Sequence, residues 1–119
     1  MSYRDQLNEL RSRTVNLLNA SGDLATSIKR MEATAYQPNA LSNREKELIG
    51  LLLGVVLHCE DCLVYHTMRC VSAGVTREQL VEGLGICAQM GGGPALAFST
   101  KALAAFDEFS SRQNSPAGD

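Results

Sequence analysis

Apolar residues recur along most of this chain at intervals of three and four, the spacing that places them on one face of an α-helix. From this pattern and its interruptions we predict about six helices. Their expected ranges are 3–19, 24–36, 43–57, 59–73, 76–90 and 94–112. The chain has no hairpin signal, internal repeat or low-complexity tract, so we expect an all-α helical bundle with short connections.

Short motifs mark where these helices begin and end. Ser42–Glu45 and Thr76–Gln79 have the spacing of a capping box, in which the first and last side chains satisfy each other's backbone N–H groups. Asp23 is expected to cap the second helix. The triplet Gly91–Gly93 should break the fifth helix, and Pro94 suits the first position of the last one.

The third predicted helix is the most hydrophobic part of the chain. Its second half lies within the apolar run Leu48–Leu57, which indicates burial on most sides. Gly50 and Gly54, four residues apart, leave room for a neighbouring helix to approach closely. The first two helices are more polar. We therefore expect N-terminal helices that pack on the core or on a neighbouring subunit, a helical core and a flexible tail, over residues 1–40, 41–112 and 113–119.

Composition narrows the class of protein. The 119 residues are enough for one domain, and with 45% hydrophobic and 5% aromatic residues the core must consist mainly of aliphatic side chains. The net charge of −2 and the lack of a dense basic cluster argue against nucleic acid or an anionic membrane as partner. No signal peptide is evident, and the longest apolar run is far shorter than the roughly 20 residues that span a bilayer. We expect a cytoplasmic protein.

Two of the four cysteines form a C-x-x-C motif, Cys59 and Cys62, which His66 follows at helical spacing. Positions 0, 3 and 7 of a helix share one face, so the two thiols and the imidazole should converge. The N-terminus of a helix also stabilises thiolate and lowers the thiol pKa from about 8.5. Cys70 and Cys87 lie alone in apolar surroundings and are expected to be inert core thiols.

This arrangement suits redox chemistry. A thiolate that attacks a peroxide becomes a sulfenic acid, a second nearby thiol condenses with it, and an external dithiol then reduces the disulfide. His66 could take the thiol proton, with Glu47 as its orienting or terminal base. Two alternatives remain: Glu47 as a solvated acid in a first helical turn, and Cys59, Cys62 and His66 as three zinc ligands that lack an evident fourth. The dithiol interpretation needs no metal or cofactor.

The constellation of Glu47, Cys59-x-x-Cys62 and His66 resembles the carboxymuconolactone decarboxylase superfamily, specifically its alkylhydroperoxidase D-like branch. Gly74–Leu80 and Gly91–Ala95 also resemble the second half of that superfamily, and the likeness covers about residues 41–109. It implies an all-α fold, assembly into dimers, trimers or hexamers, and a thiol-dependent peroxidase. In this branch Glu47, His66 and Cys62 would relay protons through water, and Cys59 would complete the disulfide.

One position departs from the branch, because Asp61 stands where characterised peroxidases often have histidine. Which thiol meets the peroxide first stays open at this stage. Two other functions also stay open: decarboxylation of a lactone, which has no evident need for a dithiol, and a non-enzymatic oligomeric scaffold or redox sensor whose disulfide switches its assembly. The partners expected are a hydroperoxide, an external dithiol and further copies of the chain.

Overall fold

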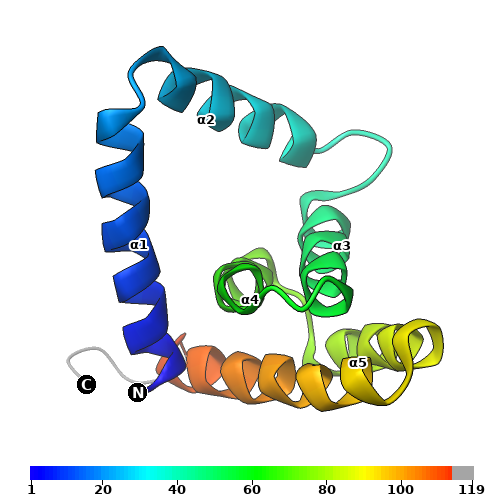
Figure 1. The fold of residues 1–119 in the computed structure, drawn as a ribbon. Coiled ribbons are helices and arrows are strands. Elements are labelled where there is room, and N and C mark those ends of the chain that lie inside the picture. Colours follow the sequence, from blue (N-terminus) through cyan, green and yellow to red (C-terminus); the bar gives the residue numbers. More distant parts are fainter. Residues whose placement is uncertain (114–119) are drawn as a thin grey trace.

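The computed structural model describes residues 1–113 and is helical throughout that range, which confirms the predicted all-α class (Figure 1). The helices are α1 (Tyr3–Ala20), α2 (Asp23–Tyr36), α3 (Asn43–Val56), α4 (Glu60–Ala73) and α5 (Arg77–Gln113). The predicted flexible tail lies, apart from its first residue, outside the described residues. None of the helices within residues 1–113 is long and apolar enough to cross a membrane.

The glycine triplet divides α5 into two halves. Gly92 has φ 70° and ψ −155°, a conformation outside the helical region that a residue without Cβ adopts readily. The predicted helices 76–90 and 94–112 are these two halves, with Pro94 just after the break. Residues 1–113 thus form five helices where six were predicted, because the last two predicted helices are the halves of α5 on either side of Gly92.

Both predicted capping boxes are present. The Ser42 hydroxyl accepts a hydrogen bond from Glu45 N at 3.1 Å, and the Glu45 carboxylate accepts one from Ser42 N at 2.9 Å. Thr76 and Gln79 make the same pair of bonds at 3.1 and 2.9 Å before α5. In both motifs the bonded residues lie three positions apart, so the start of each helix is determined by residues close together in the sequence.

The predicted cap of the second helix was wrong. Gly22, with φ 60°, precedes α2 and contributes no side-chain hydrogen bond, and Asp23 is already the first helical residue. The positive φ of Gly22 lets the chain turn sharply after Ser21, so α2 begins one residue earlier than the prediction. Asp23 then lies in the first turn, where its charge still suits the helix dipole.

The core forms where α3, α4 and α5 meet. Figure 1 shows α4 inside a frame made by the other helices, nearer to α3 and α5 than to α2. The fully buried core side chains are aliphatic or small, as the composition predicted: Leu51, Val55, Leu63, Val64, Cys70, Leu80, Ala102 and Ala105. This packing holds α4 in place and so positions the C-x-x-C motif at its start.

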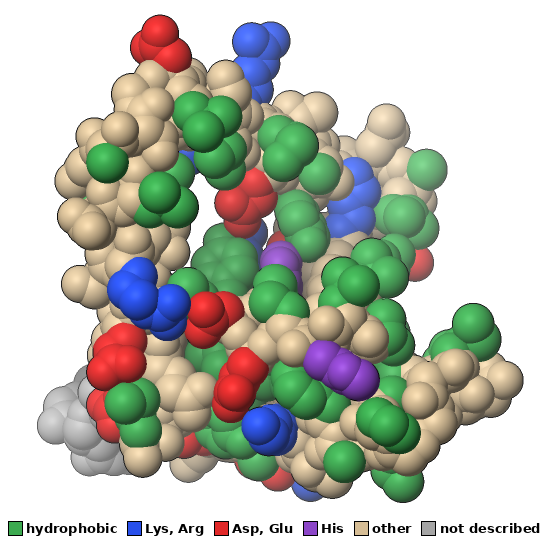
Figure 2. All heavy atoms as spheres, in the orientation of Figure 1, with side chains coloured by type: hydrophobic (Ala, Val, Ile, Leu, Met, Phe, Trp, Pro, Cys, Tyr) green, Lys and Arg blue, Asp and Glu red, His purple; other side chains and the backbone are tan. Residues whose placement is uncertain are grey.

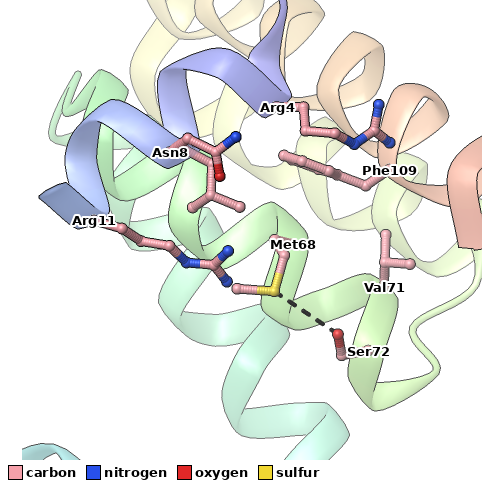
Figure 3. Close-up of a pocket in the computed structure, with 8 residues that line it drawn as sticks. Arg4, Asn8, Arg11, Met68, Val71, Ser72 and Phe109 are labelled. Carbon is pink, nitrogen blue, oxygen red and sulfur yellow. Dashed lines mark hydrogen bonds between the residues drawn. The ribbon is translucent and has the colours of Figure 1, made fainter.

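Helix α1 is attached to the core at its N-terminal end. The Glu108 carboxylate accepts hydrogen bonds from the backbone N of Tyr3 and of Arg4, at 3.2 and 2.8 Å. Arg4 lies over the Phe109 ring, 5.8 Å from its centroid. Figure 3 shows this contact at the edge of a cavity of about 300 Å³ between α1, α4 and the end of α5. A carboxylate at a helix N-terminus satisfies free N–H groups, so Glu108 fixes the start of α1.

Candidate active site

Helices α3 and α4 cross as antiparallel neighbours at three successive levels. These levels pair Glu47 with Arg69, Gly50 with His66, and Gly54 with Cys62. A Cβ added at Gly54 would lie 3.1 Å from Cys62 Cβ, and one added at Gly50 would lie 3.3 Å from His66 Nδ1. The two glycines therefore admit α4 closely, as their spacing predicted, and Cys62 and His66 both face α3.

The C-x-x-C motif forms the turn into α4. Cys59 is the N-cap residue, and its Sγ accepts a hydrogen bond from Cys62 N at 3.1 Å. A disulfide joins Cys59 and Cys62, whose Cα atoms lie 5.2 Å apart. Cys59 N in turn donates to Gly54 O at 3.0 Å, which fixes the pair against the end of α3. Both sulfurs thus lie at the positive end of the α4 dipole, where a thiolate is stabilised.

His66 lies between two tyrosines. The Tyr36 ring stacks on the imidazole with centroids 5.6 Å apart and planes 24° apart, and the Tyr65 ring meets it edge-on at 5.1 Å. His66 Nδ1 is buried and has no hydrogen-bond partner among the described residues. Burial lowers the pKa of His66, and the negative charges of Glu47 and Glu32 oppose this shift only in part. The imidazole is therefore neutral at pH 7 and able to accept a proton.

Glu47 is a buried carboxylate, 1% exposed, so the alternative of a solvated first-turn acid was wrong. Its Oε2 accepts a hydrogen bond from Arg69 Nε at 3.0 Å. The sequence predicted that Glu47 orients His66. In the structure the residue that donates a hydrogen bond to Glu47 is Arg69, which lies one turn after His66 on α4. Sequence reasoning missed Arg69 because nothing in the motif spacing distinguishes it from other surface arginines.

Sequence reasoning also missed the contribution of α2. Tyr36, the last residue of α2, covers His66, and Glu32, one turn earlier, accepts a hydrogen bond from the Tyr65 hydroxyl at 2.8 Å. Residues 1–40 carried no recognisable motif, so no local signal placed them at the site. Only the folded chain brings these α2 side chains within reach of α4.

Cys59 also lines a cavity of about 430 Å³ between α1 and the first turn of α4. The other residues that line this cavity are Gln6, Glu9, Arg13, Glu60 and Asp61. Both oxygens of Asp61 accept hydrogen bonds from the Arg13 guanidinium, at 3.3 and 3.4 Å. Asp61, which stands where characterised peroxidases of the branch often have histidine, thus has Arg13 as a counter-ion.

The other two cysteines are core residues, as predicted. Cys70 and Cys87 are buried free thiols, and burial raises the pKa of Cys70 to about 12. Cys87 Sγ lies 3.6 Å from Leu52 O, to which it donates. A thiol with so high a pKa stays protonated at neutral pH and is a poor nucleophile.

Within residues 1–113, no group of three or more His, Cys, Asp or Glu side chains is placed to hold a metal ion. The fold and the site together define a class of protein: an all-α domain with a disulfide at the start of a helix, beside a half-buried histidine and a buried glutamate. A family model for the carboxymuconolactone decarboxylase family matches residues 22–107. The chain belongs to this family, as the sequence resemblance predicted.

Three relatives illustrate the likeness. An uncharacterized protein of Cupriavidus necator is 45% identical over 73 residues, which cover 61% of this chain and 65% of that protein. A carboxymuconolactone decarboxylase family protein from Legionella pneumophila has a TM-score of 0.88 at 32% identity, covering 91% of this chain and 96% of the other. TM1620 of Thermotoga maritima, for which involvement in the antioxidative response has been suggested, has a TM-score of 0.81 at 27% identity, covering 91% and 92%.

The family match extends further towards the N-terminus than the predicted likeness, which began near residue 41. It includes α2, the helix that brings Tyr36 and Glu32 to the site. The match thus includes Tyr36 and Tyr65, whose rings contact His66. All of α1, with Arg13, lies outside it.

Proposed function

We propose that the protein is a thiol-dependent peroxidase or disulfide oxidoreductase that reduces hydroperoxides through Cys59 and Cys62. The observation that carries the proposal is the disulfide in the first turn of α4, one turn before His66, whose Nδ1 is buried without a hydrogen-bond partner in residues 1–113. A pair of sulfurs close enough to bond, at a helix N-terminus and beside a neutral imidazole, is suited to cycling between dithiol and disulfide.

The reaction balances in three steps. An external dithiol reduces the Cys59–Cys62 disulfide by exchange and leaves as its own disulfide. One protein thiolate then attacks the O–O bond of the hydroperoxide, forming an S–O bond while the departing alkoxide takes a proton and leaves as the alcohol. The second thiol attacks the sulfenic sulfur, which restores the disulfide and releases water. The net reaction converts hydroperoxide and dithiol into alcohol, water and a disulfide.

His66 is the proton carrier in this scheme. Its pKa is lowered by burial, so the neutral imidazole accepts the thiol proton and later returns it to the leaving alkoxide. Glu47 and Arg69 form an ion pair one turn away on the same helix interface, and the charge of Glu47 favours the protonated imidazole. Glu47 thus stabilises the intermediate in which His66 holds the proton.

Similarity to TM1620 supports an antioxidative role, since involvement in that response has been suggested for TM1620. The likeness of the motif to the alkylhydroperoxidase D-like branch supports the same reaction. We further propose that the reaction takes place in the cytoplasm, where reducing systems supply dithiols.

A peroxide-consumption assay with a dithiol reductant tests the proposal. Wild-type protein should consume hydroperoxide, Cys59→Ser and Cys62→Ser should lose at least about 99% of the rate, and His66→Asn and Glu47→Gln should lose about 90–99%. Cys87→Ala, which removes a core thiol away from the pair, is the matched control and should retain activity. If all of these proteins consume peroxide at the same rate, the proposal is wrong.

The same variants distinguish the two alternative functions. Lactone decarboxylation that persists in the double Cys59→Ser, Cys62→Ser variant would indicate a decarboxylase. A disulfide that forms and changes the oligomeric state without turnover would indicate a redox sensor. Trapping of a sulfenic acid in one of the two single variants, and not in the other, identifies the thiol that meets the peroxide first.

We also propose that the chain assembles with copies of itself. Large apolar side chains are exposed on α3 and on the first half of α5, among them Leu53 at 55%, Ile86 at 63% and Met90 at 75%. Figure 2 shows hydrophobic side chains over these helices, at the right of the view. Leu52 O accepts a hydrogen bond from Cys87 Sγ, so these parts of α3 and α5 are neighbours. Large exposed apolar side chains on neighbouring helices favour self-association.

A further inference from the structure

The end of α2 is attached to the site by contacts that converge on one side chain. Tyr36 is half-buried, whereas α2 as a whole has no buried residue. The Lys46 ammonium group donates a hydrogen bond to Ala35 O at 2.9 Å and another to Gln37 O, and so holds the chain on both sides of Tyr36. A cation beside the final carbonyls of a helix also complements its dipole.

Gly50 makes room for the Tyr36 hydroxyl. A Cβ at this position would overlap that hydroxyl and would lie 3.2 Å from the ring carbon that carries it. The same absent Cβ would lie 3.3 Å from His66 Nδ1, so the phenol and the imidazole fill one notch in α3. A second anchor, the hydrogen bond from the Tyr65 hydroxyl to Glu32, holds the preceding turn of α2 against α4.

Tyr36 also borders a cavity on its other side. This cavity, of about 310 Å³, is lined by residues of α2, the start of α3 and the middle of α4: Lys29, Glu32, Ala33, Tyr36, Asn43 and Arg69. The Tyr36 ring thus separates the cavity from His66, on which it stacks. Cys62 lies one helical turn before His66 and faces the same side of α3.

We propose that Tyr36 is a specificity-determining residue that limits the size of the hydroperoxide reaching the dithiol from the His66 side. Because its ring is held between the notch in α3 and the imidazole, Tyr36 obstructs bulky aryl hydroperoxides more than hydrogen peroxide and small alkyl hydroperoxides. On this route the substrate first enters the cavity that Tyr36 borders. The cavity beside Cys59 is lined by other residues, so the proposal concerns the approach to Cys62.

For its kinetic readout this inference rests on the proposed peroxidase function. The test compares kcat/KM for cumene hydroperoxide with kcat/KM for hydrogen peroxide in the wild type, Tyr36→Ala and Tyr36→Phe. Removing the ring should raise the ratio of the two constants by about tenfold, because the steric limit acts on the bulky substrate alone. Tyr36→Phe keeps the ring and loses only the hydroxyl, so its ratio should stay within about twofold of the wild type. An unchanged ratio in folded Tyr36→Ala overturns the inference.

A second measurement needs no peroxidase activity. In the Cys59→Ser background, Cys62 is alkylated with iodoacetamide and with the larger N-phenylmaleimide, and peptide mapping by mass spectrometry reports its modification alone. The ratio of the maleimide rate to the iodoacetamide rate should rise by about tenfold in Tyr36→Ala. If no variant reduces peroxide but this ratio rises, the proposed function fails and the role of Tyr36 stands. If the alkylation ratio does not change, Tyr36 does not control access.

Discussion

At the scale of single residues, burial decides what the titratable groups of the site do. Glu47 and Cys70 are both deeply buried, but Glu47 has Arg69 as a counter-ion, whereas burial, and after it the charge of Glu47, raises the pKa of Cys70 to about 12. Two opposing effects act on the pKa of His66. Burial of the ring between two tyrosines lowers it, and nearby carboxylates favour the charged form. On the protein surface, the same residue types would have pKa values close to their ordinary ones.

The lowered pKa of His66 predicts a dependence of stability on pH. Between the ordinary histidine pKa of 6.5 and the lower folded-state pKa, the unfolded chain binds a proton that the folded chain resists. The free energy of unfolding should therefore fall as the pH falls from 7.5 to 5.5. Above pH 7.5, His66 should contribute nothing to the pH dependence of this free energy. Urea unfolding at the two pH values measures it.

His66→Gln should reduce this pH dependence, because glutamine does not titrate. His58→Gln is the matched control: His58 is exposed in the turn between α3 and α4, so its replacement should leave most of the dependence in place. Equal pH dependence in the wild type and in His66→Gln would show that His66 titrates normally in the folded chain.

At the scale of helices, the close contact of α3 and α4 depends on the absence of side chains at two positions. Gly50 receives the Tyr36 hydroxyl and the imidazole, and Gly54 receives Cys62. Both glycines lie inside a helix, where glycine costs stability relative to alanine, so they are useful only because of what packs against them. The predicted close approach is thus realised, and its partner is the helix that carries the disulfide.

Gly54→Ala should therefore destabilise the protein despite its better helix propensity. The new methyl group would lie 3.1 Å from Cys62 Cβ, so α4 must shift, at a cost of about 1–3 kcal/mol in the free energy of unfolding. Gly85→Ala is the matched control, because Gly85 is an exposed residue of α5 with no atom within 4 Å of the added Cβ. It should gain about 0.5–1 kcal/mol. Equal effects of the two substitutions, measured by urea unfolding, would exclude a tight contact at Gly54.

At the scale of the whole molecule, the helices differ greatly in how much of their surface the chain itself covers. The α3–α4–α5 core buries its inner side chains fully, yet α2 has no buried residue and α3 and α5 expose large aliphatic side chains outwards. The domain division predicted from the sequence, with residues 1–40 packing on the core or on a neighbouring subunit, remains a prediction.

Self-association through α3 and α5 predicts that charge on this surface dissociates the oligomer. Ile86→Glu and Leu53→Glu should each raise the dissociation constant at least about tenfold, since burying an unpaired carboxylate is costly. Val15→Glu, at an apolar residue of α1 that is 56% exposed, is the control and should leave the mass unchanged. Analytical ultracentrifugation measures all four proteins, and a wild type that sediments as a monomer at every concentration would contradict the proposal.

Local patterns were sufficient for the helices, the capping boxes at Ser42 and Thr76, the break at Gly92 and the choice of the C-x-x-C pair over Cys70 and Cys87. These features depend on residues within a few positions of one another, so their physics can be read along the chain. The one cap that was wrong, before α2, depended on a positive φ at Gly22 that no neighbouring residue required.

Tertiary structure alone decided what surrounds His66 and Glu47. Tyr36 lies thirty positions before His66, and Arg69 lies twenty-two positions after Glu47; neither belongs to a recognisable motif. Their contacts exist because α3 and α4 pack as antiparallel neighbours and Lys46 holds the end of α2 against them. Such contacts arise from the packing of whole helices rather than from local spacing. The sequence therefore indicated which residues are candidates for the chemistry, and the fold determined their partners, their burial and the cavities beside them.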